Sequence, residues 1–111
     1  MAFSLTAEQI IDGTKTVTRR VGWNFLKSGD RIKAVRKSRG LKRGESLEVL
    51  RILEIISVSP EPLSAISQQE VRSEGFPDMT VAQFIDMFCA THANCTADTE
   101  VTRIEFIFLK T

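Results

Sequence analysis

One short stretch of the sequence, residues 13–20 (GTKTVTRR), places an amine, hydroxyls and two guanidinium groups close together. A buried lysine amine loses its proton more easily than one in water. An unprotonated amine beside a threonine hydroxyl can accept the hydroxyl proton and turn the oxygen into a nucleophile. Lys15 and Thr18 are therefore candidates for a base and a nucleophile. The competing interpretation is a basic strand edge without chemistry.

The backbone conformation of this stretch decides whether the two side chains meet. In an extended strand alternate side chains share a face, so Lys15 would point away from Thr18. At a turn or a helix end, a spacing of three residues brings them together. Gly13 is compatible with such a helix end, because glycine accepts a positive φ. The residues alone leave both arrangements open.

A second polar group, Cys89, His92 and Cys95, contains side chains that bind soft metals. Zinc sites use four ligands, or three ligands and an open position, with spacings such as CxxC or HxxxH. The spacing here fits neither pattern. We therefore expect no metal and no other cofactor, and we interpret the cysteines as reduced, small, buried apolar side chains. His92 is expected at the surface or at a helix end.

The charge of the chain is unevenly distributed, although the formal net charge is only +1. Residues 15–43 contain eleven Lys or Arg and one acid, a local charge of +10. The other 82 residues contain four bases and thirteen acids, a charge of −9. Such a basic segment is typical of a surface that contacts a polyanion, above all nucleic acid. The alternative is a solvated, charged hairpin without a partner.

The length of 111 residues, with 42% hydrophobic and 26% charged residues, is typical of one globular domain that spans residues 1–111. These values exclude a largely disordered or collagen-like chain. The longest nearly apolar stretch, residues 47–58, is interrupted by three charged residues, whereas a membrane-spanning helix needs about 20 apolar residues. The N-terminus lacks the pattern of a secretory signal peptide. We therefore expect a cytoplasmic protein.

Helix starts are predicted by three pairs of a Ser or Thr with a Glu or Gln three residues later. The three pairs are Thr6–Gln9, Ser67–Glu70 and Thr80–Gln83. The first helix is expected to end near Asp12 and the second at Gly75, because glycine is a common C-terminal stop. The third is expected to carry an apolar stripe over residues 81–89.

Strands are predicted for residues 30–36, 47–58 and 101–109, which are rich in β-branched or alternating apolar residues. A helix competes for residues 47–58, but the Ile and Val content and the following Pro60 favour a strand. The element order is a short helix, several strands, two helices and a final strand. This order predicts an α+β domain with a small curved sheet or barrel and helices at one end.

The spacing G-x-K-x-x-T-x-R of Gly13, Lys15, Thr18 and Arg20, after a short helix, resembles the signature motif of ASCH domains. Further features similar to that family follow in the family's order. They are residues 26–30 (LKSGD) before a strand, 61–63 (EPL), 74–76 (EGF) before a Thr-initiated helix, and 101–106 (VTRIEF). The resemblance covers nearly the whole chain and implies a PUA-like β-barrel with flanking short helices.

The ASCH resemblance also implies a function related to RNA or to modified nucleosides. The family includes a bacterial amidohydrolase that removes the acetyl group from N4-acetylcytidine with a Lys, a Thr and a Glu. By this resemblance Lys15 would be the proton acceptor, Thr18 the nucleophile and Glu74 the proton donor, if residues 75–78 are an insertion. Arg20 would line the cleft and stabilise an anionic oxygen, as oxyanion donors do.

The basic segment and the resemblance together predict that the protein binds RNA or a modified nucleoside. Cations of the segment would contact phosphates, and Trp23 would either stack on a base or fill the core. The expected binding residues are Arg19, Arg20, Trp23, Lys37, Arg39, Lys42 and Arg43. One alternative is an ASCH-type ribonuclease, since a phosphodiester substrate suits the basic segment. Another is a non-catalytic protein-interaction module with a basic face.

Overall fold

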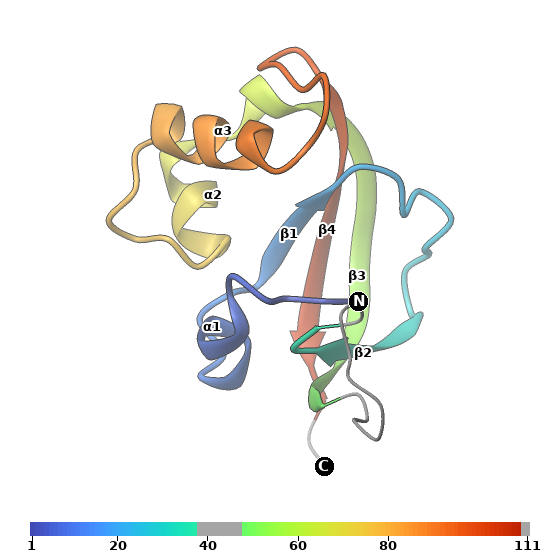
Figure 1. The fold of residues 1–111 in the computed structure, drawn as a ribbon. Coiled ribbons are helices and arrows are strands. Elements are labelled where there is room, and N and C mark those ends of the chain that lie inside the picture. Colours follow the sequence, from blue (N-terminus) through green and yellow to red (C-terminus); the bar gives the residue numbers. More distant parts are fainter. Residues whose placement is uncertain (38–47, 110–111) are drawn as a thin grey trace, which may run out of the picture.

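The computed structural model describes residues 1–37 and 48–109, and Figure 1 shows how their helices and strands are arranged. No helix in these ranges is long and apolar enough to cross a membrane. The elements in chain order are α1 (Ala7–Ile11), β1 (Val17–Arg20), β2 (Arg31–Val35), β3 (Val49–Pro62), a 3-10 helix (Leu63–Ala65), α2 (Gln68–Ser73), α3 (Val81–Ala90) and β4 (Glu100–Phe108).

The four strands form one antiparallel sheet in the order β1-β4-β3-β2. The register of the pairing shifts between Ala34 and Val35 and again between Ile55 and Ser57. Such irregularities increase the local twist of a strand, which helps the sheet to curl into a half-barrel. Short helices lie beside this half-barrel in Figure 1. The predicted α+β fold with a small curved sheet and flanking helices is therefore confirmed.

The predicted strand at residues 47–58 is present as β3, but β3 continues to Pro62 and so is longer than expected. The strand was predicted to end at residue 58, before Pro60. Beyond Glu54 the pairing register of β3 involves β4 alone, so a proline nitrogen can face the open side without loss of a ladder hydrogen bond. The extension carries Glu61 to the end of the sheet that lies near α2 and α3 (Figure 1).

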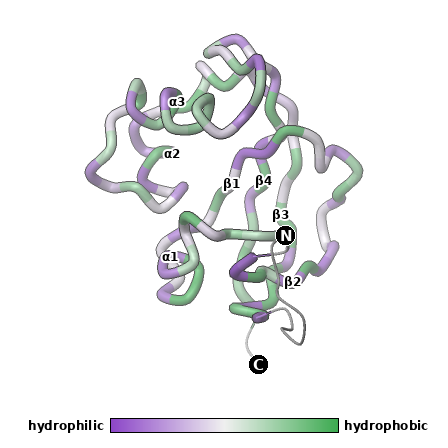
Figure 2. The backbone as a smooth tube through the Cα atoms, in the orientation of Figure 1, coloured by the Kyte–Doolittle hydropathy of each residue, from purple (hydrophilic) through white to green (hydrophobic). Residues whose placement is uncertain are grey.

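The inner face of the sheet packs against the N-terminal segment and α1. Side chains that alternate along β4 point to this face, as the period of two in its sequence predicts. The buried residues of this first core are Phe3, Ile10, Leu26, Ala34, Leu53, Ile55, Ile104 and Phe106. Figure 2 shows that hydrophilic residues nevertheless occur on β1, in the middle of the molecule. The site described below is built on that strand.

A second core joins α2, α3 and the start of β4. Its buried residues are Leu63, Ile66, Val71, Phe84, Phe88 and Val101. The apolar stripe predicted for residues 81–89 lies in this core, because Val81, Ile85 and Cys89 also pack against it. The stripe is therefore structural, as the sequence analysis assumed.

The three predicted capping boxes differ in outcome. Thr80 and Gln83 form a complete box at the start of α3. Ser67 accepts from the backbone N–H of Glu70, as predicted, but the Glu70 carboxylate turns to other partners. The box at Thr6 was wrong: Thr6 makes no side-chain cap hydrogen bond, and Gln9 donates to the Gly75 carbonyl. Tertiary contacts therefore replace the whole box at α1, and at α2 they replace only the part that Glu70 would have made.

Candidate functional site

The centre of the candidate site is an ion pair between Lys15 and Glu74, two residues that are 59 positions apart in the sequence. The Lys15 Nζ lies 2.7 Å from Glu74 Oε1 and donates a second hydrogen bond of 2.8 Å to the Glu74 carbonyl. Each side chain is only 3% exposed. A buried charge needs a partner of this kind, because burial without one costs several kcal/mol.

Backbone hydrogen bonds hold these two residues in place from both sides. Lys15 follows the turn after α1, and its N–H donates to the Gln9 carbonyl over 3.1 Å. The next N–H, that of Thr16, donates to the Ser73 carbonyl at the end of α2 over 2.9 Å. Glu74 is the C-terminal cap residue of α2. The start of β1 and the end of α2 are therefore joined through main chain as well as side chains.

Arg19 lies on the same side of β1 as this pair and contacts three carboxylates. Its Nε donates to Glu61 over 2.8 Å, its Nη1 to Glu74 over 3.1 Å and its Nη2 to Glu70 over 2.9 Å. The side chain is 1% exposed, so its charge is neutralised within the protein. These contacts tie β1 to the far end of β3 and to α2.

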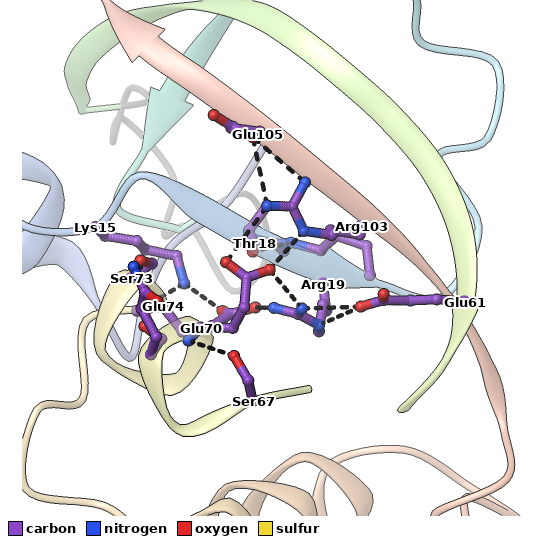
Figure 3. Close-up of polar contacts among 12 residues, drawn as sticks. Lys15, Thr18, Arg19, Glu61, Ser67, Glu70, Ser73, Glu74, Arg103 and Glu105 are labelled. Atoms are coloured by element: carbon purple, nitrogen blue, oxygen red, sulfur yellow. Dashed lines mark hydrogen bonds and ion pairs between the residues drawn. The ribbon is translucent and has the colours of Figure 1, made fainter. Parts of the chain in front are cut away.

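Glu70 bridges two arginines that the sheet places opposite each other. Arg19 and Arg103 are register partners on β1 and β4, where like charges repel. The Glu70 carboxylate accepts hydrogen bonds from both guanidinium groups, and Arg103 also contacts Glu105 over 3.3 Å (Figure 3). We call the whole set the ion-pair network. Its members are Lys15, Arg19, Glu61, Glu70, Glu74, Arg103 and Glu105.

Thr18 and Arg20 lie on the opposite face of β1, because side chains alternate along a strand. Thr18 is 3% exposed, and its Oγ1 accepts a hydrogen bond of 3.3 Å from Arg20 Nε. Arg20 Nη2 donates to the Ala2 carbonyl over 2.7 Å, and the guanidinium lies 4.6 Å from the centre of the Phe3 ring. Within residues 1–37 and 48–109, Arg20 forms no ion pair with a carboxylate.

Electrostatic interactions connect the two faces of β1 into one site. Burial lowers the pKa of Lys15 from its ordinary 10.5, Glu74 acts in the opposite direction, and the charges of Arg20 and Arg19 lower it further. Burial also lowers the pKa of Arg20, again against the charge of Glu74. Arg20 is therefore close enough to Lys15 to affect the pKa of the amine, and Thr18 is hydrogen-bonded to Arg20. Lys15 and Glu74 contact each other on one face of β1, and Thr18 and Arg20 contact each other on the other face.

This arrangement provides four chemical groups that can act on an amide or an ester. The Lys15 amine and the Glu74 carboxyl share a hydrogen bond along which a proton can move. Thr18 supplies a hydroxyl, and Arg20 supplies a positive charge that can stabilise an oxyanion. No described contact joins Thr18 directly to Lys15 or to Glu74, so a direct proton transfer between them requires a rearrangement of side chains.

Comparisons with solved structures identify the fold. An ASCH domain from Lactobacillus crispatus JV V101 superposes with a TM-score of 0.71 at 18% identity, over 97% of this chain and 75% of that chain. The fold is that of an ASCH domain. The protein EF3133 from Enterococcus faecalis V583, of the family DUF984, matches with a TM-score of 0.62 at 15% identity, over 96% and 68% of the two chains. No protein-family model matches the sequence, and no curated protein matches it.

Within this ASCH fold, Trp23 serves partly as core. It lies in the β1–β2 connection, packs against the first core and remains partly accessible. Its φ is +58°, an unusual conformation for a bulky residue. The ring lies 5.5 Å from that of Phe25, which is 67% exposed. Both interpretations of Trp23 have a structural basis, and base stacking remains a prediction.

The basic segment does not form one uniform cationic surface in the part of the chain that the structure describes. Four cations of this segment form ion pairs with glutamates, namely Lys15, Arg19, Arg31 and Arg36. Lys37 is exposed at the end of the described segment. The predicted contacts at Arg39, Lys42 and Arg43 lie outside the described residues. The high local charge therefore arises in part from cations that the fold neutralises with acids from the rest of the chain.

The Cys89, His92 and Cys95 group lies at the end of α3. His92 stacks on the Phe88 ring with centroids 4.2 Å apart, and its Nδ1 lies 2.8 Å from the Phe88 carbonyl. The two cysteines are free and partly buried against the second core. Hydrogen bonding with Cys95 and burial raise the pKa of the Cys89 thiol to about 11. Among the described residues no group of three His, Cys, Asp or Glu is placed to hold a metal ion.

Four members of the ion-pair network were not among the predicted site residues. They are Glu61, Glu70, Arg103 and Glu105. The register between β1 and β4 would have indicated two of them, Arg103 and Glu70. Once Arg19 is paired with Arg103, an acid between them is required, and Glu70 at the start of α2 is within reach. The sequence alone does not determine that register, because β1 and β4 are far apart in the chain and pair only in the folded sheet.

Proposed function

We propose that this protein belongs to the ASCH family and binds RNA or a modified nucleoside next to Lys15, Thr18, Arg20 and Glu74. The observation that carries the proposal is the buried contact between Lys15 and Glu74, 59 positions apart, in a fold shared with an ASCH domain. The Gly13, Lys15, Thr18 and Arg20 spacing resembles the motif of that family, and the corresponding Glu was expected at position 74. A functional site needs such convergence of distant residues.

Arg20 supports a ligand with an oxygen-rich or anionic group. It is the cation of the motif that forms no carboxylate ion pair among the described residues, although burial lowers its pKa. A half-buried guanidinium without an acid partner is costly to maintain, and such groups concentrate at functional sites. The Thr18 hydroxyl beside it adds a hydrogen-bonding group for the same ligand.

Hydrolysis of an amide, as in an acetylated nucleoside, is the reaction that the Lys15–Glu74 pair suits best. Burial lowers the pKa of Lys15, so that its amine can pass one proton along the hydrogen bond to the Glu74 carboxylate and become neutral. After a rearrangement of side chains brings Thr18 Oγ1 within reach of Lys15 Nζ, the amine accepts the Thr18 proton as the hydroxyl oxygen attacks the acyl carbon. Glu74 gives its proton to the leaving amine, and water releases the acyl group from Thr18.

Two other functions predict different results in binding and turnover experiments. A ribonuclease would cleave phosphodiesters, and its binding would weaken steeply with salt. A protein-interaction module would neither bind nucleic acid nor turn over a nucleoside. The experiment below separates both from the proposed function.

The test of binding compares Arg20→Ala with Arg31→Ala in titrations of a 12-nucleotide single-stranded RNA and of N4-acetylcytidine. Arg31 is a matched control because its side chain is 67% exposed and pairs only at 3.5 Å with Glu54. We expect Arg20→Ala to weaken binding of the RNA or the nucleoside about tenfold or more, the size of a lost charged hydrogen bond. Arg31→Ala should change nucleoside binding less than twofold.

Equal weakening by the two variants would assign binding to the general basic surface and reject the site. An absence of binding to both RNA and nucleoside by the wild type would reject the proposed function and favour a protein-interaction module. Release of nucleotides from the RNA during the titration would instead identify a ribonuclease.

A further inference from the structure

A groove lies on the surface between α1 and the segment that follows α2, and Gly75, the residue after Glu74, is part of its lining. Two adjoining hollows of about 570 Å³ and 620 Å³ make up this groove. Both are lined by Gln9, Gly75 and Pro77. Phe76, Met79 and Gln83 line one hollow, and Thr14 lines the other. The groove is large enough for a nucleoside-sized molecule, since small-ligand pockets start at about 300 Å³.

One contact, between Gln9 and Gly75, lies where the two hollows meet. The Gln9 Nε2 donates to the Gly75 carbonyl over 3.1 Å. Gly75 has a φ of +103°, and a Cβ at this position would lie 2.9 Å from Gln9 Cγ. Only glycine allows this close approach, because any larger residue would strain the backbone and displace the glutamine.

The backbone connects this contact to the buried ion pair. Gly75 directly follows Glu74, whose carbonyl accepts from Lys15 Nζ over 2.8 Å. Gln9 accepts the Lys15 N–H through its own carbonyl. Each residue of the Gln9–Gly75 contact is therefore attached to one member of the Lys15–Glu74 pair. Of the two residues in this contact, only Gln9 contributes a side chain, so Gln9 is the residue that can rotate away.

We propose that a substrate reaches Lys15 and Glu74 through this groove, and that the Gln9 side chain is the gate that opens for it. The inference rests on the proposed function for the identity of the site, but the opening itself does not depend on that function. Rotation of one glutamine breaks a single hydrogen bond between neutral groups. Such a bond contributes little net free energy, so the gate can open without disturbing the cores.

The charges around the groove indicate which ligands it admits. Three of its residues are acidic, namely Glu8, Asp12 and Asp78, and one, Arg72, is basic. Like charges repel a phosphate that approaches such a rim. Phe76 and Met79 offer apolar surface against which a flat ring can pack. The groove therefore favours an uncharged nucleoside or another flat, neutral amide over a nucleotide.

The test of the gate measures how fast the Lys15 amine is acetylated by an N-hydroxysuccinimide ester, followed by peptide mass spectrometry. The exposed Lys27 and Lys33 serve as internal references. We expect slow labelling of Lys15 in the wild type and an increase of at least tenfold in Gln9→Ala. Gln83→Ala, which removes a carboxamide from the same groove, should change the Lys15 rate less than twofold.

An unchanged Lys15 rate in Gln9→Ala would overturn the gate, and so would an equal increase in Gln83→Ala, which would indicate general loosening. If Gln9→Ala does not fold, Gln9→Asn provides the same test, because it keeps the amide but shortens its reach. An unchanged Lys15 rate in that variant would likewise overturn the gate.

The test of ligand class compares N4-acetylcytidine with its 5′-monophosphate in titrations of the wild type. We expect the nucleoside to bind at least tenfold more tightly, and the triple variant Glu8→Gln, Asp12→Asn, Asp78→Asn to reduce that ratio to below threefold. Equal or tighter binding of the monophosphate by the wild type would overturn the charge selection. Turnover of the nucleoside with an unchanged Lys15 rate in Gln9→Ala would reject the gate and leave the proposed function intact. Faster Lys15 labelling in Gln9→Ala without binding of either compound would support the gate and reject the function.

Discussion

The two faces of β1 carry the same types of residue, but the cations on the two faces have different partners. On one face, Lys15 and Arg19 are surrounded by carboxylates from α2 and β3. On the other face, Arg20 is held by the Ala2 carbonyl, the Thr18 hydroxyl and the Phe3 ring. The comparison teaches that a basic motif contains two kinds of cation. One kind fixes helices to the sheet through ion pairs, and the other forms no ion pair with a carboxylate among the described residues.

The first face also explains how short helices stay attached to a small sheet. α2 has six residues, too few for a stable helix by itself. Glu70 and Glu74 connect it to β1 and β4 through three cations. Buried ion pairs of this kind specify a geometry more than they add stability, since their desolvation cost offsets most of the attraction.

The largest expected effect is the loss of stability in Glu74→Ala. This change leaves Lys15 buried without its acid and removes one of three carboxylates from Arg19. We expect the free energy of unfolding to fall by about 3–5 kcal/mol, the usual result when one partner of a buried pair is removed. Urea titration followed by circular dichroism measures this change.

The control for Glu74→Ala is Glu105→Ala, because Glu105 belongs to the same network but is 42% exposed. Its loss should cost about 0–1 kcal/mol, as for other surface pairs. Similar losses in the free energy of unfolding for the two variants would contradict the proposed difference between the buried and the exposed parts of the network.

A smaller effect is expected from acid, through Glu70. Hydrogen bonding from Arg103 is the main cause that lowers the pKa of Glu70 below its ordinary 4.5, and Arg19 adds to it. Because the folded pKa lies below the unfolded one, the contribution of Glu70 is complete above about pH 4.5 and is lost as the pH falls through the folded pKa. Glu70→Gln should remove this part of the acid sensitivity.

Thermal unfolding of the wild type and Glu70→Gln from pH 7 down to pH 3 measures the difference. The gap between the two melting temperatures should narrow as the pH falls. A constant gap over this range would show that the ionisation of Glu70 does not contribute, and that the two arginines are held by other groups.

The smallest effect on stability is expected on the other face of β1. Thr18→Ala removes an acceptor whose only described donor is Arg20 Nε, at 3.3 Å. We expect a loss of about 1 kcal/mol in urea titration, as for one ordinary hydrogen bond. Thr18→Val, which keeps the shape, should cost no more. A loss above about 3 kcal/mol would mean that Thr18 is structural, like the opposite face.

Much of the fold was predictable because local signals agree with the tertiary structure. The complete cap at Thr80 and Gln83 places α3, and the alternation in residues 101–109 gives the inner face of β4. The end of β3 was not predictable from Pro60. Whether a proline stops a strand depends on which neighbouring strand pairs there, and that is a property of the sheet.

The candidate site was only partly predictable, since charge counts along a sequence do not reveal partners. Arg19 was expected to contact phosphate, but it is buried between acids from positions 61, 70 and 74. The approach of Glu74 to Lys15 followed from the family resemblance, not from spacing. The Gln9–Gly75 contact was not predicted, because Gln9 also fits a local capping box with Thr6 and was assigned to it.

The most direct test of the functional site is an HPLC assay of deacetylation of N4-acetylcytidine by the purified protein. The account predicts cytidine release by the wild type and its loss in Thr18→Ala, with less than about a hundredth of the activity remaining. Lys15→Ala and Glu74→Ala should also be inactive, and circular dichroism must show that each variant is folded. Release at the same rate by wild type and folded Thr18→Ala, or no release by the wild type, would contradict the assignment of Lys15, Thr18 and Glu74 to amide hydrolysis.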